Sequence, residues 1–194
     1  MVQNLAIVLK SNFPINQRVT IFDKTLGKIE ASVLRKDIIL SNGMLFSYNF
    51  SQNNTFQIIK DIYFIEMPCI EKSNLMFFHN VLELCNYFLP FGISFYELFD
   101  YLNFLYISFD KIQTLQVQKI FLSKFFLILG FYPEINTSST FDYIMYLPID
   151  RAVNETINLT IEKELNTWII NCINMHPHIR AFKTFKFLNE IAIT

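Results

Sequence analysis

A change in hydrophobic period near residue 71 constrains the fold of this chain more than any other feature. Before it, apolar residues alternate with polar ones or form short β-branched runs, which is typical of strands. After it, apolar residues recur at the spacing of helices. The sequence therefore predicts an α+β chain, with a strand-rich domain at residues 1–70 and an all-helical domain at residues 71–194.

Turn residues divide the first part into five predicted strands. Gly27, after the second of them, suits a hairpin position that needs a positive φ. Five short strands with a small core favour a five-stranded Greek-key barrel of the oligonucleotide-binding (OB) type, although an SH3-like barrel or a half-sandwich would give a similar pattern. The predicted strands are Asn4–Lys10, Arg18–Asp23, Lys28–Val33, Met44–Phe50 and Thr55–Pro68.

Helical patterns fill most of the second part. Ser73 and Ser94 are candidate N-caps of the first two helices, and Glu97 completes a capping box with Ser94. The segment 131–150 is predicted to be a loop with a short extended piece. The predicted helices are 75–89, 95–107, 113–129, one starting at Asn154 or Glu155 and reaching Asn174, and a last one from Pro177.

Charge is distributed unevenly along a chain whose formal net charge is only −1. That net charge gives no global field strong enough to indicate a nucleic-acid binder. Residues 1–36, however, hold six cations against two acids, whereas residues 71–194 hold nine cations against twelve acids. Because the positive charge gathers at the front, a polyanionic partner would bind there.

Cysteines and apolar runs indicate a cytoplasmic protein. Cys69, Cys85 and Cys172 are isolated, which favours free buried thiols in a reducing compartment over disulfides or a metal site. Charged residues such as Lys124 and Glu97 interrupt the longest apolar runs, so no membrane span of about 20 residues is predicted. The first residues also lack the pattern of a signal peptide.

Catalytic signals are weak. Of the three histidines, His79 lies in an apolar helical pattern, and His176 and His178 flank a proline with no carboxylate or cysteine at ligand spacing. The sequence holds no GxSxG, Gly-rich phosphate loop or HExxH motif. We therefore expect a protein that is not an enzyme and carries no cofactor.

The predicted hairpin of residues 18–36 carries the main functional signal. Cations on strand surfaces can neutralise phosphates and release counterions, a binding mode that depends on salt rather than on base sequence. Phe13 and Phe22 are candidate stacking platforms, although core positions suit them better in a chain with 22 phenylalanines. An ordinary solvated face would show the same cations. The candidate DNA-binding residues are Lys10, Arg18, Lys24, Lys28, Arg35 and Lys36.

A second basic segment lies near the C-terminus. In HIRAFKTFKFLNEI, Arg180, Lys183 and Lys186 alternate with Phe182 and Phe185, which gives a cationic edge beside an apolar stripe on a helix. Such a surface suits DNA or the acidic, hydrophobic tail of a partner protein. A terminal helix that packs its apolar face on the protein and exposes its charges would look the same.

These segments, in this order, resemble the RecO family of recombination mediators. The resemblance is carried by AIVL at Ala6–Leu9, Arg18-x-Thr20, Gly27-Lys28, LGFYPEI at Leu129–Ile135 and RAFKTFKFL at Arg180–Leu188. It implies an OB fold followed by a helical domain, binding and annealing of single- and double-stranded DNA, and help in loading recombinase onto strands covered by the single-strand-binding protein SSB. It also implies contacts with RecR and with the acidic SSB tail, in the bacterial cytoplasm near the nucleoid.

The chain departs from the family at its zinc-binding segment. Many members carry cysteines after the Gly-x-x-Pro region, where this chain reads NTSSTFDY, with Ser138 and Phe141 near the places of a first pair. We therefore expect no zinc. The competing interpretation is a protein–protein adaptor whose barrel binds a peptide or subunit and whose cations are merely solvated.

Overall fold

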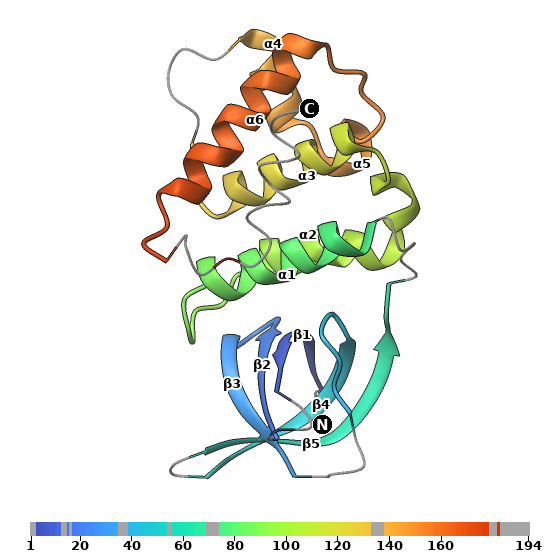
Figure 1. The fold of residues 1–194 in the computed structure, drawn as a ribbon. Coiled ribbons are helices and arrows are strands. Elements are labelled where there is room, and N and C mark those ends of the chain that lie inside the picture. The colour runs from blue at the N-terminus through green and yellow to red at the C-terminus, as the bar shows by residue number, and fades with distance from the viewer. Residues whose placement is uncertain are drawn as a thin grey trace. The chain divides into compact units, whose positions relative to one another are not determined.

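The computed structural model describes residues 3–12, 15, 17–34, 39–53, 56–68, 74–132, 138–178 and 182. Its first five elements are the strands β1 (Asn4–Ser11), β2 (Arg18–Asp23), β3 (Gly27–Val33), β4 (Leu45–Asn53) and β5 (Phe56–Glu66). They form a closed barrel in the order β1-β2-β3-β5-β4, in which β3 and β5 run parallel and the other pairs antiparallel (Figure 1). Helices follow the barrel, so the predicted α+β fold with an OB-type barrel is confirmed.

The barrel core is built from alternate positions of each strand. On β2, for example, Val19 and Ile21 are buried in the core, whereas Arg18 on the other parity is exposed. The members of the core therefore recur with the period of two that a strand imposes, although Thr20 and Phe22 on the outward face of β2 are buried as well. Inward-facing side chains of all five strands contribute: Ala6, Val8, Val19, Ile21, Ile29, Ala31, Val33, Phe46, Tyr48 and Ile59.

A buried carboxylate shapes the β2–β3 hairpin. One oxygen of Asp23 accepts hydrogen bonds from the backbone N–H groups of Thr25 and Leu26, each at 2.7 Å, and its other oxygen accepts from the Tyr48 hydroxyl at 2.7 Å. Gly27 ends the turn with a φ of 75°, as predicted. A Cβ at Gly27 would lie 2.0 Å from the carbonyl oxygen of Ile93, so both the backbone angle and the available space require glycine.

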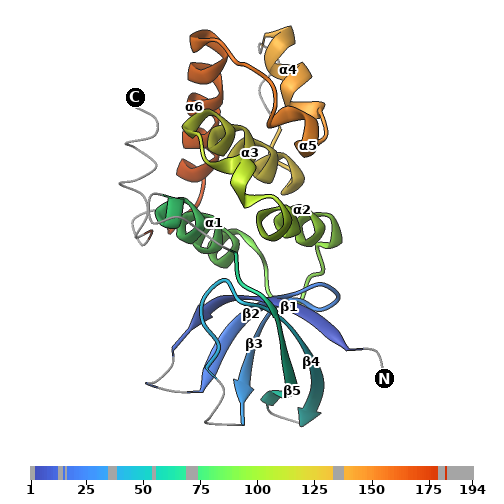
Figure 2. The ribbon, with the colours of Figure 1, turned by 90° about the vertical axis from the view of Figure 1, so that its right-hand side faces the viewer.

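The chain divides into two compact units, Met1–Ile70 with Phe78–Ile107, and Glu71–Phe77 with Ser108–Thr194. The first unit therefore contains the barrel, most of α1 (Leu75–Phe88) and all of α2 (Tyr96–Ile107). The two helices lie across one end of the barrel (Figures 1 and 2). The predicted boundary between folding domains at residues 70 and 71 stays a prediction.

Contacts between these two helices and the barrel are aromatic and polar. The rings of Phe22 on β2 and Phe99 on α2 lie 5.5 Å apart, and the Tyr106 hydroxyl donates to the Gly43 carbonyl at 2.8 Å. A Cβ at Gly43 would lie 2.2 Å from the Phe78 ring. The helices therefore cover outward-facing barrel residues that period-two patterning alone would leave in water.

All the regular elements in the described part of the second unit are helices. The unit contains the 3-10 helix η2 (Phe109–Ile112) and the helices α3 (Leu115–Ile128), α4 (Ser139–Tyr146), α5 (Ile149–Ala152) and α6 (Leu159–Asn174). None of the helices in the described residues is both long enough and apolar enough to cross a bilayer.

Two sequence predictions were wrong in this unit. The predicted extended piece is helical, because Ser138 caps α4 at the Phe141 N–H and the Phe141 ring packs edge-on against Trp168 at 6.0 Å. The next helix starts at residue 159 rather than at 154 or 155, because the Asn158 side chain accepts from the Ile161 N–H and caps α6. The predicted cap Ser73 and most of the predicted last helix lie outside the described residues.

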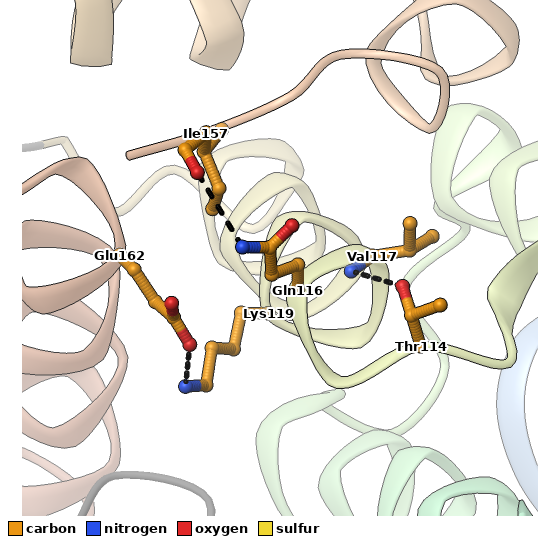
Figure 3. A network of polar contacts seen from close by, with 6 residues as sticks. All are labelled: Thr114, Gln116, Val117, Lys119, Ile157 and Glu162. Carbon is orange, nitrogen blue, oxygen red and sulfur yellow. Dashed lines mark hydrogen bonds and ion pairs between the residues drawn. The ribbon is translucent and has the colours of Figure 1, made fainter. Parts of the chain in front are cut away.

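Two buried lysines connect the helices of the second unit. Lys119 on α3 is fully buried and donates to the Glu162 carboxylate on α6 (Figure 3). Lys124, five residues further along α3, donates to the backbone carbonyls of Met145 and Leu147 at the end of α4. Burial lowers the pKa of Lys124 to about 8. Both ammonium groups therefore hold neighbouring helices together.

Candidate nucleic-acid interface

The outward face of β1, β2 and β3 carries the exposed part of the predicted DNA-binding set. Lys10 lies opposite Thr20, and Thr20 lies opposite Glu30, so the three side chains form one row across the strands. Arg18 lies opposite Ser32 on the same face. Lys10, Arg18 and Glu30 are exposed, and we call the surface formed by these three residues and Ser32 the strand face.

Lys28 does not belong to the strand face. Its side chain is buried, and its ammonium donates to the backbone carbonyl of Asn86 on α1 at 2.8 Å and lies 4.2 Å from the centre of the Phe91 ring. Burial lowers the pKa of Lys28, and nearby Cys85 and Glu30 oppose this shift. In this structure the cation joins the barrel to α1 and the segment after it, and its ammonium is not presented to a phosphate.

Lys24, in the hairpin turn, is partly engaged. Its ammonium lies 2.7 Å from a carboxylate oxygen of Asp100 on α2 and 5.9 Å from the centre of the Phe99 ring. The side chains of Lys24 and Asp100 are 36% and 62% exposed, so water screens the pair and it contributes little to stability. A phosphate group can therefore compete with Asp100 for this lysine.

The other predicted site residues fall outside the described residues: Arg35, Lys36, Arg180, Lys183 and Lys186. Phe13, one of the two candidate stacking residues, does too. The second, Phe22, is fully buried against α2, which confirms its interpretation as a core residue.

Sequence patterning missed the exposed aromatic residues of β5. Tyr63 and Phe64 are 56% and 60% exposed, and Ile65 and Met67 beside them are exposed too. The signal was present as the run IYFI, in which consecutive apolar residues break the alternation that a half-buried strand requires.

The described residues show no arrangement for metal binding. No group of three histidine, cysteine or acidic side chains gathers in this part of the chain. Cys85 and Cys172 are free and buried, as predicted, and burial raises the pKa of the Cys172 thiol to about 12. His178 donates its backbone N–H to a ring nitrogen of His176 at 3.2 Å, so these two histidines shape a turn.

The second unit holds an apolar surface pocket of about 410 Å³. It lies where the residues after α3 meet the C-terminal half of α6. The chain's single tryptophan contributes to its wall. Its lining residues include Phe131, Tyr132, Trp168, Cys172 and Met175.

The comparisons with known proteins do not assign this chain. No family model matches it, and no curated protein matches it either. The structure establishes the architecture, a five-stranded barrel followed by helices. Membership of the RecO family stays a proposal.

Proposed function

We propose that the chain is a non-enzymatic, RecO-like mediator of DNA repair and recombination whose barrel binds single-stranded nucleic acid. The observation that carries the proposal is the exposure of Lys10 and Arg18 on adjacent strands of an OB-type barrel. OB-type barrels bind oligonucleotides over the face of their second and third strands, and Arg18 lies on the second strand of this one.

Binding of this kind is electrostatic. Each phosphate neutralised on a single strand contributes about 0.7 to the slope of log affinity against log salt. Lys10, Arg18 and Lys24, with Arg35 and Lys36, would give a slope of at most about 3.5. The bases would stay free to pair, so that two captured strands can anneal.

The test is a titration of labelled single-stranded DNA at several salt concentrations, with annealing followed in the same tube. Arg18→Glu and Lys10→Glu should each weaken binding and flatten the salt dependence, because each removes a phosphate contact and adds a repulsive charge. Lys111→Glu, an exposed reversal in the second unit, is the matched control and should leave the titration unchanged. If all three variants bind single-stranded DNA with the affinity of the wild type, the strand face is not the binding surface.

An adaptor function is the alternative, and one observation favours it. Lys28 is buried and Lys24 pairs with Asp100, so two of the six predicted cations already have partners within the chain. Glu30, moreover, offsets part of the positive charge of the strand face. If wild-type protein binds no DNA even at low salt, the adaptor interpretation replaces the mediator.

For the partner contacts, we propose that the SSB tail binds to the second unit and that a RecR-like protein is a further partner. The tail proposal is supported by the apolar pocket at Trp168, because an acidic tail with aromatic residues needs an apolar receptor beside cations. Arg180, Lys183 and Lys186 follow Met175 of the pocket closely in sequence. A short acidic-aromatic peptide should change the fluorescence of Trp168, and Lys183→Glu should weaken its binding.

A further inference from the structure

The second half of β5 is an open, apolar strand edge. β5 pairs with β4 from Phe56 to Glu66, but with β3 only at Ile58 and Ile59. Beyond that point, no strand of the described residues pairs with the other side of β5. Figures 1 and 2 show β5 continuing from there toward the start of α1.

A bulge marks where this open edge begins. Asp61 has a φ of 48°, its carboxylate accepts a hydrogen bond from the Asn49 amide at 2.9 Å, and the register against β4 shifts there. A second register shift against β4 lies between Phe64 and Glu66, so β5 carries one extra residue on each side of Tyr63. Tyr63, Phe64 and Ile65 are between 46% and 60% exposed. Proteins usually protect such edges with charges or proline, because unpaired backbone groups beside apolar side chains invite another strand.

The charges that flank the edge select one kind of strand. Lys60 precedes the apolar run and Glu66 ends it. In an antiparallel pair of two identical β5 edges, with the two-fold axis at Tyr63, Lys60 of each copy lies opposite Glu66 of the other. A shift by one residue places Asp61 opposite Glu66, and parallel pairing in register places like charges together, so both are disfavoured.

We propose that β5 is a self-association edge, through which two copies of this chain pair antiparallel about Tyr63. The two-fold arrangement uses the same surface on both copies, as isologous dimers do. It buries the apolar side chains of Ile62–Ile65 from each copy and forms two Lys60–Glu66 contacts. None of these residues belongs to the proposed DNA-binding set, so the dimer and the DNA-binding function can be tested independently of each other.

Charge reversal with complementation tests the register. Sedimentation velocity of the full chain, from about 1 to about 100 micromolar, should show a dimer. Lys60→Glu places Glu opposite Glu66, and Glu66→Lys places Lys opposite Lys60, so each variant alone should dimerise at least about tenfold more weakly. An equimolar mixture should recover a heterodimer, because every contact is again between opposite charges. Lys111→Glu is the control and should dimerise as wild type.

A crosslink tests the position of the axis independently. In a Cys69→Ser background, Tyr63→Cys should form an intermolecular disulfide on mild oxidation, because directly opposite residues of antiparallel strands lie about 4.5–5.5 Å apart. Ile65→Cys should not, because Asp61 of the other copy lies opposite it. Cys85 and Cys172 are buried and leave the background low.

Three results would overturn the proposal. The first is a wild-type chain that stays monomeric over the whole concentration range. The second is a mixture of Lys60→Glu and Glu66→Lys that associates no better than either alone. The third is a monomeric chain in which Phe64→Ser weakens binding of single-stranded DNA, which would show that the edge contacts bases instead.

Discussion

Replacing Lys28 tests whether this cation stabilises the first unit or faces a ligand. Its ammonium makes one charge-assisted hydrogen bond, to the Asn86 carbonyl, and one cation–π contact, to the Phe91 ring. The first contributes about 1.5–3 kcal/mol and the second about 1–2 kcal/mol in a desolvated setting. The cost of burying the charge, visible in the lowered pKa of Lys28, offsets part of both.

We therefore expect Lys28→Met to lower the free energy of unfolding by about 2 kcal/mol, because the methionine keeps the apolar stem and loses only the polar contacts. Lys28→Glu should cost about 4 kcal/mol, because it buries an unpaired carboxylate beside a carbonyl oxygen. Lys10→Glu, on the exposed strand face, is the matched control and should change stability by no more than about 0.5 kcal/mol.

Urea denaturation followed by far-UV circular dichroism measures these differences. The single tryptophan lies in the second unit, so its fluorescence reports on that unit alone. If Lys28→Glu unfolds at the same urea concentration as Lys10→Glu and loses DNA binding, Lys28 faces the polyanion and the structural role assigned to it is wrong. If it unfolds earlier, weak DNA binding by this variant says nothing about a phosphate contact.

Three further predictions concern the turn and the buried lysines. Gly27→Ala should destabilise the first unit by at least about 2 kcal/mol more than Gly92→Ala, because both residues have positive φ but only Gly27 lacks space for a Cβ. Equal urea midpoints of the two variants would contradict this prediction. Glu162→Leu should lower the free energy of unfolding by about 3 kcal/mol, and by more than Lys119→Met, because Lys119 is fully buried whereas the Glu162 side chain keeps 14% exposure. The double variant should recover most of the lost stability. Tryptophan fluorescence in a urea titration measures all three variants. Burial lowers the pKa of Lys124 from 10.5 to about 8, so between these pH values the unfolded chain binds more protons than the folded one. The free energy of unfolding of wild type, relative to that of Lys124→Met, should therefore rise with pH by up to about 3 kcal/mol. A difference that does not change with pH would show that the amine is not desolvated.

Local periodicity was enough to predict the architecture. The five strands and the helices α1, α2 and α3 were placed within a few residues of their observed bounds, because strand alternation and helical spacing are properties of neighbouring residues. Gly27 was assigned its positive φ for the same reason, since a tight turn requires it locally. The barrel type followed from the number and shortness of the strands.

Periodicity could not say which outward-facing positions another element covers. Lys28 and Glu30 share one face of β3, yet Lys28 is buried under a helix that lies more than fifty residues away in sequence. The start of α6 likewise depended on a cap at Asn158 rather than on the apolar pattern.

The sequence by itself therefore determined the order of strands and helices and the location of the positive charge along the chain. Only the tertiary structure decided which cations reach water, that Lys10 and Arg18 share a face with Glu30, and that β5 ends in an exposed apolar edge. The physical reason is that burial and strand pairing are contacts between distant segments, and these contacts leave no period in the residues that make them.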